Sequence, residues 1–395
     1  MNILTRGVAG AFFVTEQNMA TEFRDKLFCL IRAGMGLKVN PVSLLEDEYE
    51  KLKLIGERQS IQPILLNGLE KTGAPEMTIQ KFDQACLRDI HQIVQHDIAL
   101  DNICAVLDEV KVPYVLLKGA ALRNLYPDLS LRTSCDIDVL VHEEDLEKAI
   151  DIIEACTDFK KQQRNYHDVS MISSRVYLEL HFSISENMKN IDQILDHVWD
   201  YAQPSENGFR YDLTPEFQIF HVIAHMSYHM VHGGIGIRMY LDLWLLRTHL
   251  VYDEKTVCQM CDECGILQFY QVCCDLIGVW MEEREYTDKT KVLEDFCLSG
   301  GVFGTTENAA ASRLREKNVS GHIFSRLFAS KTIMEKEYPE LKTKPYLLPI
   351  CQVKRWTRLL NKQKRQQIRN EVRNVKLTSK DSIESFDKVM KELGL

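Results

Sequence analysis

The stretch that decides the fold covers residues 115–141 and reads VLLKGAALRNLYPDLSLRTSCDIDVLV. Its first part follows Pro113 and is a short apolar run that ends at Gly119, which is typical of a buried strand leading into a turn. A short helix (AALRNLY) and a turn at Pro127 come next, and CDIDVLV predicts a second strand. This order of elements indicates a small unit of mixed strands and helices.

The strand and helix signals continue beyond this stretch. EEDLEKAIDIIEACTDF (residues 143–159) has helical periodicity with acidic residues in its first turn. RVYLELHFSI (residues 175–184) alternates strictly, which predicts a half-buried third strand. The segment between them, residues 160–174, is polar, and no strand signal is found beyond Pro204.

Helical periodicity dominates on both sides of these strands, over residues 19–100 and again over residues 215–300. We therefore expect an α+β fold with a small mixed β-sheet core at residues 101–205. An N-terminal helical segment (residues 1–100) and a C-terminal helical domain (residues 206–395), which ends in a basic tail, would flank this core.

The bulk composition is that of an ordinary globular protein, with 395 residues, 45% hydrophobic and 27% charged. No apolar run reaches the ~18–20 residues that a bilayer requires. The apolar stretch Val8–Val14 is short and has no clear cleavage site after it, so it does not indicate a secretory signal. The net charge of −9 argues against a surface that binds polyanions throughout. We expect a cytoplasmic protein without a membrane span.

Twelve cysteines are spread along the chain at a density too low for a small disulfide scaffold, so we expect reduced thiols. Cys258, Cys261 and Cys264 have CxxCxxC spacing, which can hold a metal when the thiolates converge from a loop. In this chain they lie in a helical pattern, and no CxxxCxxC or Cys-Pro signature follows. The pattern favours structural core cysteines over a metal site.

Two carboxylates stand out on the second strand. Asp136 and Asp138 are two residues apart, so both side chains project from the same face of the strand. Glu179 occupies the polar face of the third strand and joins them if the two strands are neighbours. Clustered carboxylates repel one another unless a cation lies between them, and Mg²⁺ prefers carboxylate and phosphate oxygens. A D-x-D alone is common on exposed strands, so the metal site depends on this context.

The segment before these carboxylates suits phosphate binding. Gly119 lies at a strand-to-helix turn, where free backbone N–H groups face outward. Lys118, Arg123 and Arg132 add positive charge to the same region, which suits a triphosphate. A phosphate cradle, a carboxylate pair and a third carboxylate thus follow one another along the chain.

These residues carry a resemblance to a known family. VLLKGAALRNLYPDLSLRTSCDIDVLV and the later YLELHF resemble the nucleotidyltransferase superfamily of DNA polymerase β. They are most similar to an uncharacterised bacterial nucleotidyltransferase family with the pattern LKG…L…Y…R…DIDLLV…ELH. The resemblance implies that Gly119 forms the turn that holds the NTP phosphates, and that Asp136 and Asp138 bind two Mg²⁺ ions. It also implies that Glu179 is the third carboxylate and a general base.

One position departs from the superfamily pattern. The second residue of the turn is usually Ser or Gly, whereas this chain has Ala120 and so lacks a hydroxyl that contacts phosphate in the superfamily. We count Ala120 with Lys118, Gly119, Arg123 and Arg132 as the nucleotide-binding group, and our hypothesis is that Lys118 compensates for the missing hydroxyl.

Weaker signals concern the acceptor side. His225 and His229 lie i,i+4 on one helical face, but the HExxH signature is absent, so a polar cleft wall or structural histidines are favoured over a metal. GGIGIR (residues 233–238) lacks the third glycine of a dinucleotide loop and predicts a break between two helices. Arg238 and Asp242 on the next helix favour a surface ion pair, or else a substrate role. The acceptor-cleft candidates are His181, His225, His229, Arg238 and Asp242.

The sequence therefore predicts a metal-dependent nucleotidyltransferase that moves an NMP from an NTP, such as ATP, to an acceptor hydroxyl and releases pyrophosphate. A small-molecule acceptor is favoured. Transfer to tRNA or to a protein is the alternative, and its support is the basic stretch Lys354–Lys376. A nucleotide-binding module without turnover is a third hypothesis, because of Ala120.

Overall fold

A mixed sheet of seven strands forms one side of the molecule, in the order β3-β4-β5-β2-β1-β7-β6. The computed structural model describes residues 21–395 except 175, 207, 317–327, 330, 358–365, 367, 368, 371, 372 and 376, and omits the side chains of residues 85, 332 and 336. The strands are β1 (Tyr114–Leu116), β2 (Asp136–Val141), β3 (Lys160–Arg164), β4 (Asp168–Ile172), β5 (Tyr177–His181), β6 (Ala202–Pro204) and β7 (Arg210–Leu213).

The central pairings of the sheet are both parallel and antiparallel. β2 lies parallel to β5 and antiparallel to β1, whereas β1 lies parallel to β7. The outer strands β3, β4 and β6 are all joined antiparallel. This arrangement confirms the predicted α+β fold with a mixed sheet and flanking helices.

Two parts of the sheet differ from the sequence-based expectation. The polar segment at residues 160–174 forms the β3–β4 hairpin, and residues 210–213, beyond Pro204, form β7. β3 reads KKQQR and lies at the sheet edge with most side chains exposed, so it has no apolar face to signal a strand. Of the β7 residues only Leu213 is buried, so β7 also lacks the alternation of apolar and polar residues that would predict a strand.

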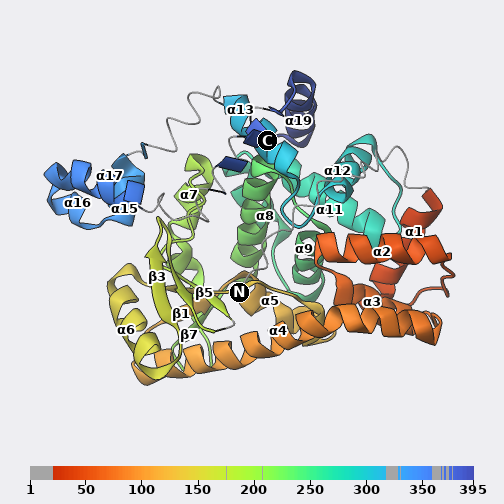
Figure 1. Cartoon of the computed structure of the whole chain (residues 1–395), viewed down its shortest axis with the longest axis horizontal. Coiled ribbons are helices and arrows are strands. Elements are labelled where there is room, and N and C mark those ends of the chain that lie inside the picture. The colour runs from red at the N-terminus through yellow and green to blue at the C-terminus, as the bar shows by residue number, and fades with distance from the viewer. Residues whose placement is uncertain are drawn as a thin grey trace.

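The N-terminal helices are α1 (Thr21–Gly34), α2 (Glu46–Gln59), α3 (Gln62–Lys71) and α4 (Glu76–Glu109). α4 extends from the helical side of the molecule to the sheet, where it packs against α6 (Leu146–Cys156) (Figure 1). It passes without a break across residue 100, at which the sequence suggested a domain boundary. The boundaries at residues 100 and 205 stay predictions.

Helices make up most of the chain after β5. In chain order they are α7 (Lys189–Leu195), α8 (Pro215–His232), α9 (Ile237–His249), α10 (Glu254–Glu263), α11 (Leu267–Glu282), α12 (Asp288–Ser299), α13 (Thr306–Glu316), α15 (Lys331–Glu337), α16 (Glu340–Thr343), α17 (Leu348–Thr357) and α19 (Lys380–Leu393). The glycines at residues 233–236 separate α8 from α9, as predicted. In the described part of the chain, no helix is both long and apolar enough to cross a membrane.

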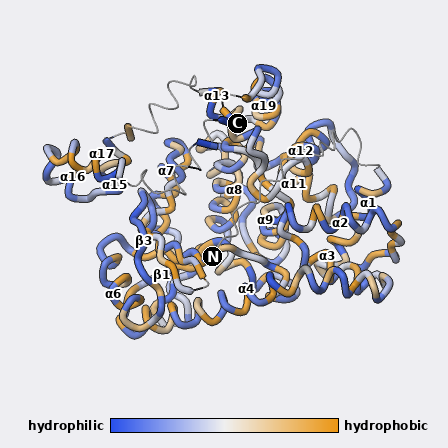
Figure 2. Tube along the Cα trace, viewed as in Figure 1, coloured by the Kyte–Doolittle hydropathy of each residue, from blue (hydrophilic) through white to orange (hydrophobic). Residues whose placement is uncertain are grey.

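Two large hydrophobic cores divide the molecule. One lies between the sheet, α4 and α6, and the other joins the N-terminal helices to α8, α9, α11 and α12. In the second core, Phe28 of α1 stacks on Trp280 of α11 with ring centroids 4.6 Å apart. Figure 2 shows hydrophobic residues on the central strands, whereas β3 is hydrophilic. α8 and α9 stand between the sheet and the helices α1, α2, α11 and α12 (Figure 1).

The cysteines contribute to these cores. All twelve are free, and Cys261 and Cys264 are buried in and beside α10, while Cys258 is half-buried. Burial raises the pKa of the Cys264 thiol to about 11 and that of Cys261 further still. Neutral thiols of this kind pack as small hydrophobic side chains, as the sequence suggested.

Candidate active site

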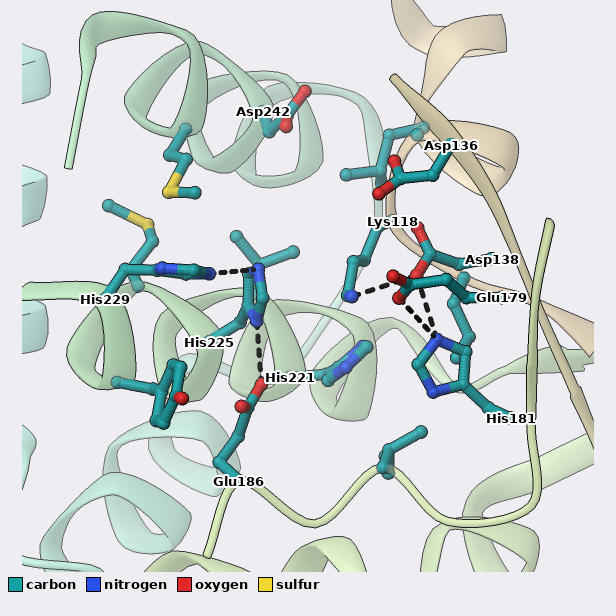
Figure 3. Close-up of a pocket in the computed structure, with 18 of the residues that line it drawn as sticks. Lys118, Asp136, Asp138, Glu179, His181, Glu186, His221, His225, His229 and Asp242 are labelled. Carbon is teal, nitrogen blue, oxygen red and sulfur yellow. Dashed lines mark hydrogen bonds and ion pairs between the residues drawn. The ribbon is translucent and has the colours of Figure 1, made fainter. Parts of the chain in front are cut away.

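The register of β2 and β5 brings the predicted carboxylates together. Asp138 lies directly opposite Glu179 in the parallel pair, and Asp136 lies opposite Tyr177 one pleat away. Ile137, on the other face of β2, is buried in the core between the sheet and α4. The strand alternation therefore places Asp136, Asp138 and Glu179 on one face, at the wall of a pocket (Figure 3).

Asp138 is the best-connected of the three carboxylates. Its side chain is 2% exposed, and its Oδ1 accepts hydrogen bonds from Lys118 Nζ and His181 Nε2, both at 2.9 Å. His181 Nε2 also lies 3.5 Å from Glu179 Oε2. The sequence assigns His181 to the acceptor cleft, and the structure places it in this pocket beside the carboxylates.

The three carboxylates differ in the positive charge that lies beside them. Burial raises the pKa of Asp138, but Lys118 and His181 outweigh it and hold that pKa well below the ordinary value. The pKa of Asp136 is raised by burial and by the charges of Asp138 and Glu179. In the described residues Asp136 forms no ion pair, and Ser134 Oγ is its hydrogen-bond donor at 3.2 Å. Asp136 therefore lacks a cation of its own.

This donor set fits a divalent metal ion. Asp138, Glu179 and His181 can each offer one ligand atom, and these atoms lie within 4.8 Å of one another. Asp136 lines the same pocket and adds a further carboxylate, which forms no ion pair within the described residues. Oxygen-rich groups with excess negative charge suit a hard cation such as Mg²⁺.

The turn after β1 forms the next part of the pocket. Lys118 begins the short helix α5 (Lys118–Leu122) in a left-handed conformation (φ 44°), which is unusual for a residue with a side chain. A Cβ on Gly119 would lie 3.0 Å from Ser134 Oγ and 3.5 Å from Arg132 Nη1. The glycine thus allows the loop before β2 to approach the turn closely.

The basic residues predicted to bind phosphate differ in placement. Lys118 and Arg132 line the main pocket, whereas Arg123 and Ala120 line a cavity of only about 10 Å³ behind the turn. Arg123 forms an ion pair there with Asp97 of α4. Arg132 binds both carboxylate oxygens of Asp242 at 2.8 Å. Lys118 is therefore the one of these cations that lies among the candidate metal ligands.

Helix α9 supplies the residues that the sequence placed in a surface ion pair. That expectation was wrong, because Arg238 and Asp242 are 8% and 5% exposed and do not pair with each other. Asp242 instead binds Arg132 and accepts a 2.8 Å hydrogen bond from the Tyr126 hydroxyl. Arg238 Nη1 donates to the carbonyl oxygen of Thr133 at 3.0 Å. Both residues line the pocket, so a substrate role stays open.

Helix α8 forms the wall across from the carboxylates (Figure 3). His225 Nδ1 lies 2.7 Å from Glu186 Oε1, and His225 Nε2 lies 3.1 Å from His229 Nε2. Burial lowers the pKa of His221 to about 3 and that of His229 to about 2. These histidines are therefore neutral at physiological pH and can exchange hydrogen bonds with hydroxyl groups.

Several pocket residues were not found from the sequence. They include Ser134, Tyr166, His167, Glu186, Tyr228, Met239 and Phe303. Glu186 had a usable signal, because it follows closely on the strand that carries Glu179 and His181. The aromatic residues had none, since Tyr166 lies in an unpredicted hairpin and Phe303 lies after α12. The complete pocket has a volume of about 260 Å³.

Comparisons with known proteins identify the family of this chain. A solved structure, that of the antibiotic-resistance factor ANT(2'')-Ia, matches over 44% of this chain and 90% of its own length. The sequence identity is 15% and the TM-score 0.33, so no inference of function rests on this likeness. The search of curated proteins found no match. A family model described as uncharacterised nucleotidyltransferase matches residues 46–282, more than half of the chain. The chain is therefore a member of this uncharacterised nucleotidyltransferase family.

Proposed function

We propose that this chain is a metal-dependent nucleotidyltransferase of the DNA polymerase β type, which transfers an NMP from an NTP to an acceptor hydroxyl. The observation that carries the proposal is the parallel register of β2 and β5. It sets Asp138 beside Glu179, with Asp136 on the same face and the Lys118–Gly119 turn at the same pocket. Membership of a nucleotidyltransferase family supports an NTP as the substrate.

Asp136, Asp138 and Glu179 would hold the metal, with His181 as a further ligand or as a hydrogen-bond partner of Asp138. We expect two Mg²⁺ ions, as the resemblance implies. When bound, Mg²⁺ supplies positive charge that stabilises the attacking and leaving oxygens during displacement at phosphorus. The position of Asp136 in this pocket, without an ion pair among the described residues, supports this assignment.

The protein side chains then have distinct tasks. Lys118 and the turn at Gly119 hold the phosphates, and Ser134 presents a hydroxyl against that turn, where Ala120 has none. Glu179 is 36% exposed, and among the three carboxylates it suits the removal of the acceptor's proton. The acceptor oxygen forms a bond to the α-phosphorus as the bond to the bridging oxygen breaks. Pyrophosphate leaves, and Glu179 retains the proton.

A small molecule is the acceptor that the pocket supports best. Its volume of about 260 Å³ lies just below the range of roughly 300–1,000 Å³ that is typical of small-molecule sites, and leaves little room for a macromolecule. The acceptor wall combines neutral histidines with Tyr166, Tyr228 and Phe303, which suits hydroxyl groups on an apolar frame. The basic stretch Lys354–Lys376, which favours tRNA or a protein, lies largely outside the described residues.

Incubation with each α-labelled NTP, Mg²⁺ and a cell extract tests the proposal. We expect label to enter a low-molecular-weight compound, with release of pyrophosphate, and both to disappear in Asp138→Asn. Label in tRNA or protein would support the macromolecular alternative. Nucleotide binding without label in any fraction would support the module without turnover.

A further inference from the structure

Four basic side chains surround the turn at Gly119, and three of them have a carboxylate partner. These pairs are Lys118 with Asp138, Arg123 with Asp97, and Arg132 with Asp242. Arg238 is the fourth, and within the described residues it forms no ion pair. The carboxylate nearest to it along α9, that of Asp242, is already bound through both oxygens by Arg132.

Arg238 is also deeply buried and incompletely hydrogen-bonded. It is 8% exposed and lines the main pocket. Nη1 donates to the carbonyl oxygen of Thr133 at 3.0 Å and lies 3.3 Å from Thr133 Oγ1, while the buried Nε has no partner. Burial and the charge of Arg132 lower the pKa of Arg238. A guanidinium held in this way is costly to the fold unless an anion enters the pocket beside it.

The position of Arg238 indicates which anion this is. Its hydrogen bond is to Thr133, in the loop between Arg132 and Ser134, and Ser134 packs against Gly119. This loop lies at the Asp136 end of the site, whereas the acceptor wall of α8 lies across the pocket. Arg132 is bound by Asp242, so among the described residues at that end Arg238 is the basic side chain that no carboxylate engages. A phosphate group can pair with it while a bound cation offsets the charge of Asp136.

We propose that Arg238 binds the terminal phosphate of the NTP and thereby selects NTPs over nucleoside monophosphates. The inference rests on the proposed function and extends it, because it moves Arg238 from the acceptor cleft to the nucleotide site. The guanidinium offers paired N–H donors that match two phosphate oxygens. Asp242 keeps Arg132 in place beside the turn and leaves Arg238 free for the ligand.

Nucleotide affinity measured without turnover tests this proposal. Full-length wild type, Arg238→Gln and Arg238→Met are titrated calorimetrically with each of ATP, GTP, CTP and UTP, and with the matching NMPs, with Ca²⁺ replacing Mg²⁺. We expect both variants to bind the preferred NTP roughly 10- to 100-fold more weakly, as for loss of a charged hydrogen bond. Affinity for the NMP should not change. Arg247→Gln is the matched control, since Arg247 lies on the same helix but pairs with Glu254 outside the pocket.

The melting temperature gives a second readout. If Arg238 had a purely structural role, its substitution would lower the melting temperature. Removing a buried charge that has no partner should leave the melting temperature of Arg238→Met equal to that of wild type or raise it. The rise that saturating NTP causes in wild type should shrink in the variant.

Three outcomes would overturn the inference. Unchanged NTP affinity in a folded variant assigns the anion to another molecule, such as a phosphorylated or carboxylated acceptor. Equal loss of NTP and NMP binding, with a lower melting temperature, assigns Arg238 to the fold. If wild type itself binds no nucleotide, the proposed function is overturned as well. This outcome is distinct from the other two, because it is seen in the protein without any substitution.

Discussion

The buried ion pair between Arg132 and Asp242 offers a quantitative test of how the sheet and the helices are joined. Both side chains are 6% exposed, and two hydrogen bonds of 2.8 Å connect them. Asp242→Asn removes the charge with little change in shape. Arg132 and Arg238 then lie together without a carboxylate partner, and the Tyr126 hydroxyl loses a charged acceptor.

The expected cost follows from these contacts. Removing one partner of a buried ion pair costs about 3–5 kcal/mol, because the remaining charge stays desolvated. The weakened bond from Tyr126 adds about 1 kcal/mol. We therefore expect Asp242→Asn to lose about 4–6 kcal/mol of unfolding free energy. The double variant Arg132→Met/Asp242→Leu, which removes both charges of the pair, should recover most of it.

Urea unfolding of wild type, Arg132→Met, Asp242→Leu and Arg132→Met/Asp242→Leu, with Asp242→Asn alongside, is followed by tryptophan fluorescence and by circular dichroism and measures the coupling. A coupling energy of less than about 0.5 kcal/mol, the range found for independent sites, would refute the reasoning. So would a double variant that is less stable than Asp242→Asn. Asp200→Asn is the control, because Asp200 pairs with His197 on the surface, where about 0–1 kcal/mol is expected.

Three further predictions concern the site and the pH dependence of stability. Asp138→Asn should lower pyrophosphate release at least about 100-fold with folding intact, as for loss of a group that stabilises developing charge, and activity above a tenth of wild type would contradict the site. Gly119→Ala places a Cβ 3.0 Å from Ser134 Oγ, so we expect weaker NTP binding in calorimetric titrations, and an affinity equal to that of wild type would contradict the need for a close approach at this turn. Burial lowers the pKa of His96 to about 4, so between about pH 6.5 and 4 His96 is protonated in the unfolded chain but neutral in the folded state. Stability should therefore fall as the pH drops from about 6.5 to 4, by about 2 kcal/mol at pH 5 from this residue, and His96→Gln should flatten the urea midpoints measured between pH 7 and 5.

The sequence predicted the parts of the site that depend on local patterns. The alternation in CDIDVLV and RVYLELHFSI was sufficient to place Asp136, Asp138 and Glu179 on one face, and β2 and β5 are indeed neighbours. The helical periodicity of α6, α8 and α9 was equally clear, because each buries a face against a core.

Other features depend on tertiary contacts that no local pattern reports. The partner of Arg132 lies 110 residues away on α9, so the i,i+4 spacing of Arg238 and Asp242 was misleading. Arg123 turned toward Asp97 of α4, although its position in the sequence suggested a phosphate ligand. β3 was missed because an edge strand needs no apolar face, and Tyr166 and His167, in the turn that follows it, were missed with it.

The helical core that unites the two ends of the described chain has a consequence for biosynthesis. Phe28 stacks on Trp280, and Arg24 forms an ion pair with Glu294, so residues more than 250 positions apart complete the same core. At a translation rate of roughly 5–20 residues per second, some 10–50 s pass between the synthesis of α1 and that of α11 and α12. During that time α1 can already pack against α3, but Phe28 lacks Trp280 and Arg24 lacks Glu294. Nascent chains that stop before α11 should therefore depend on chaperones, whereas the sheet can already close around its own core.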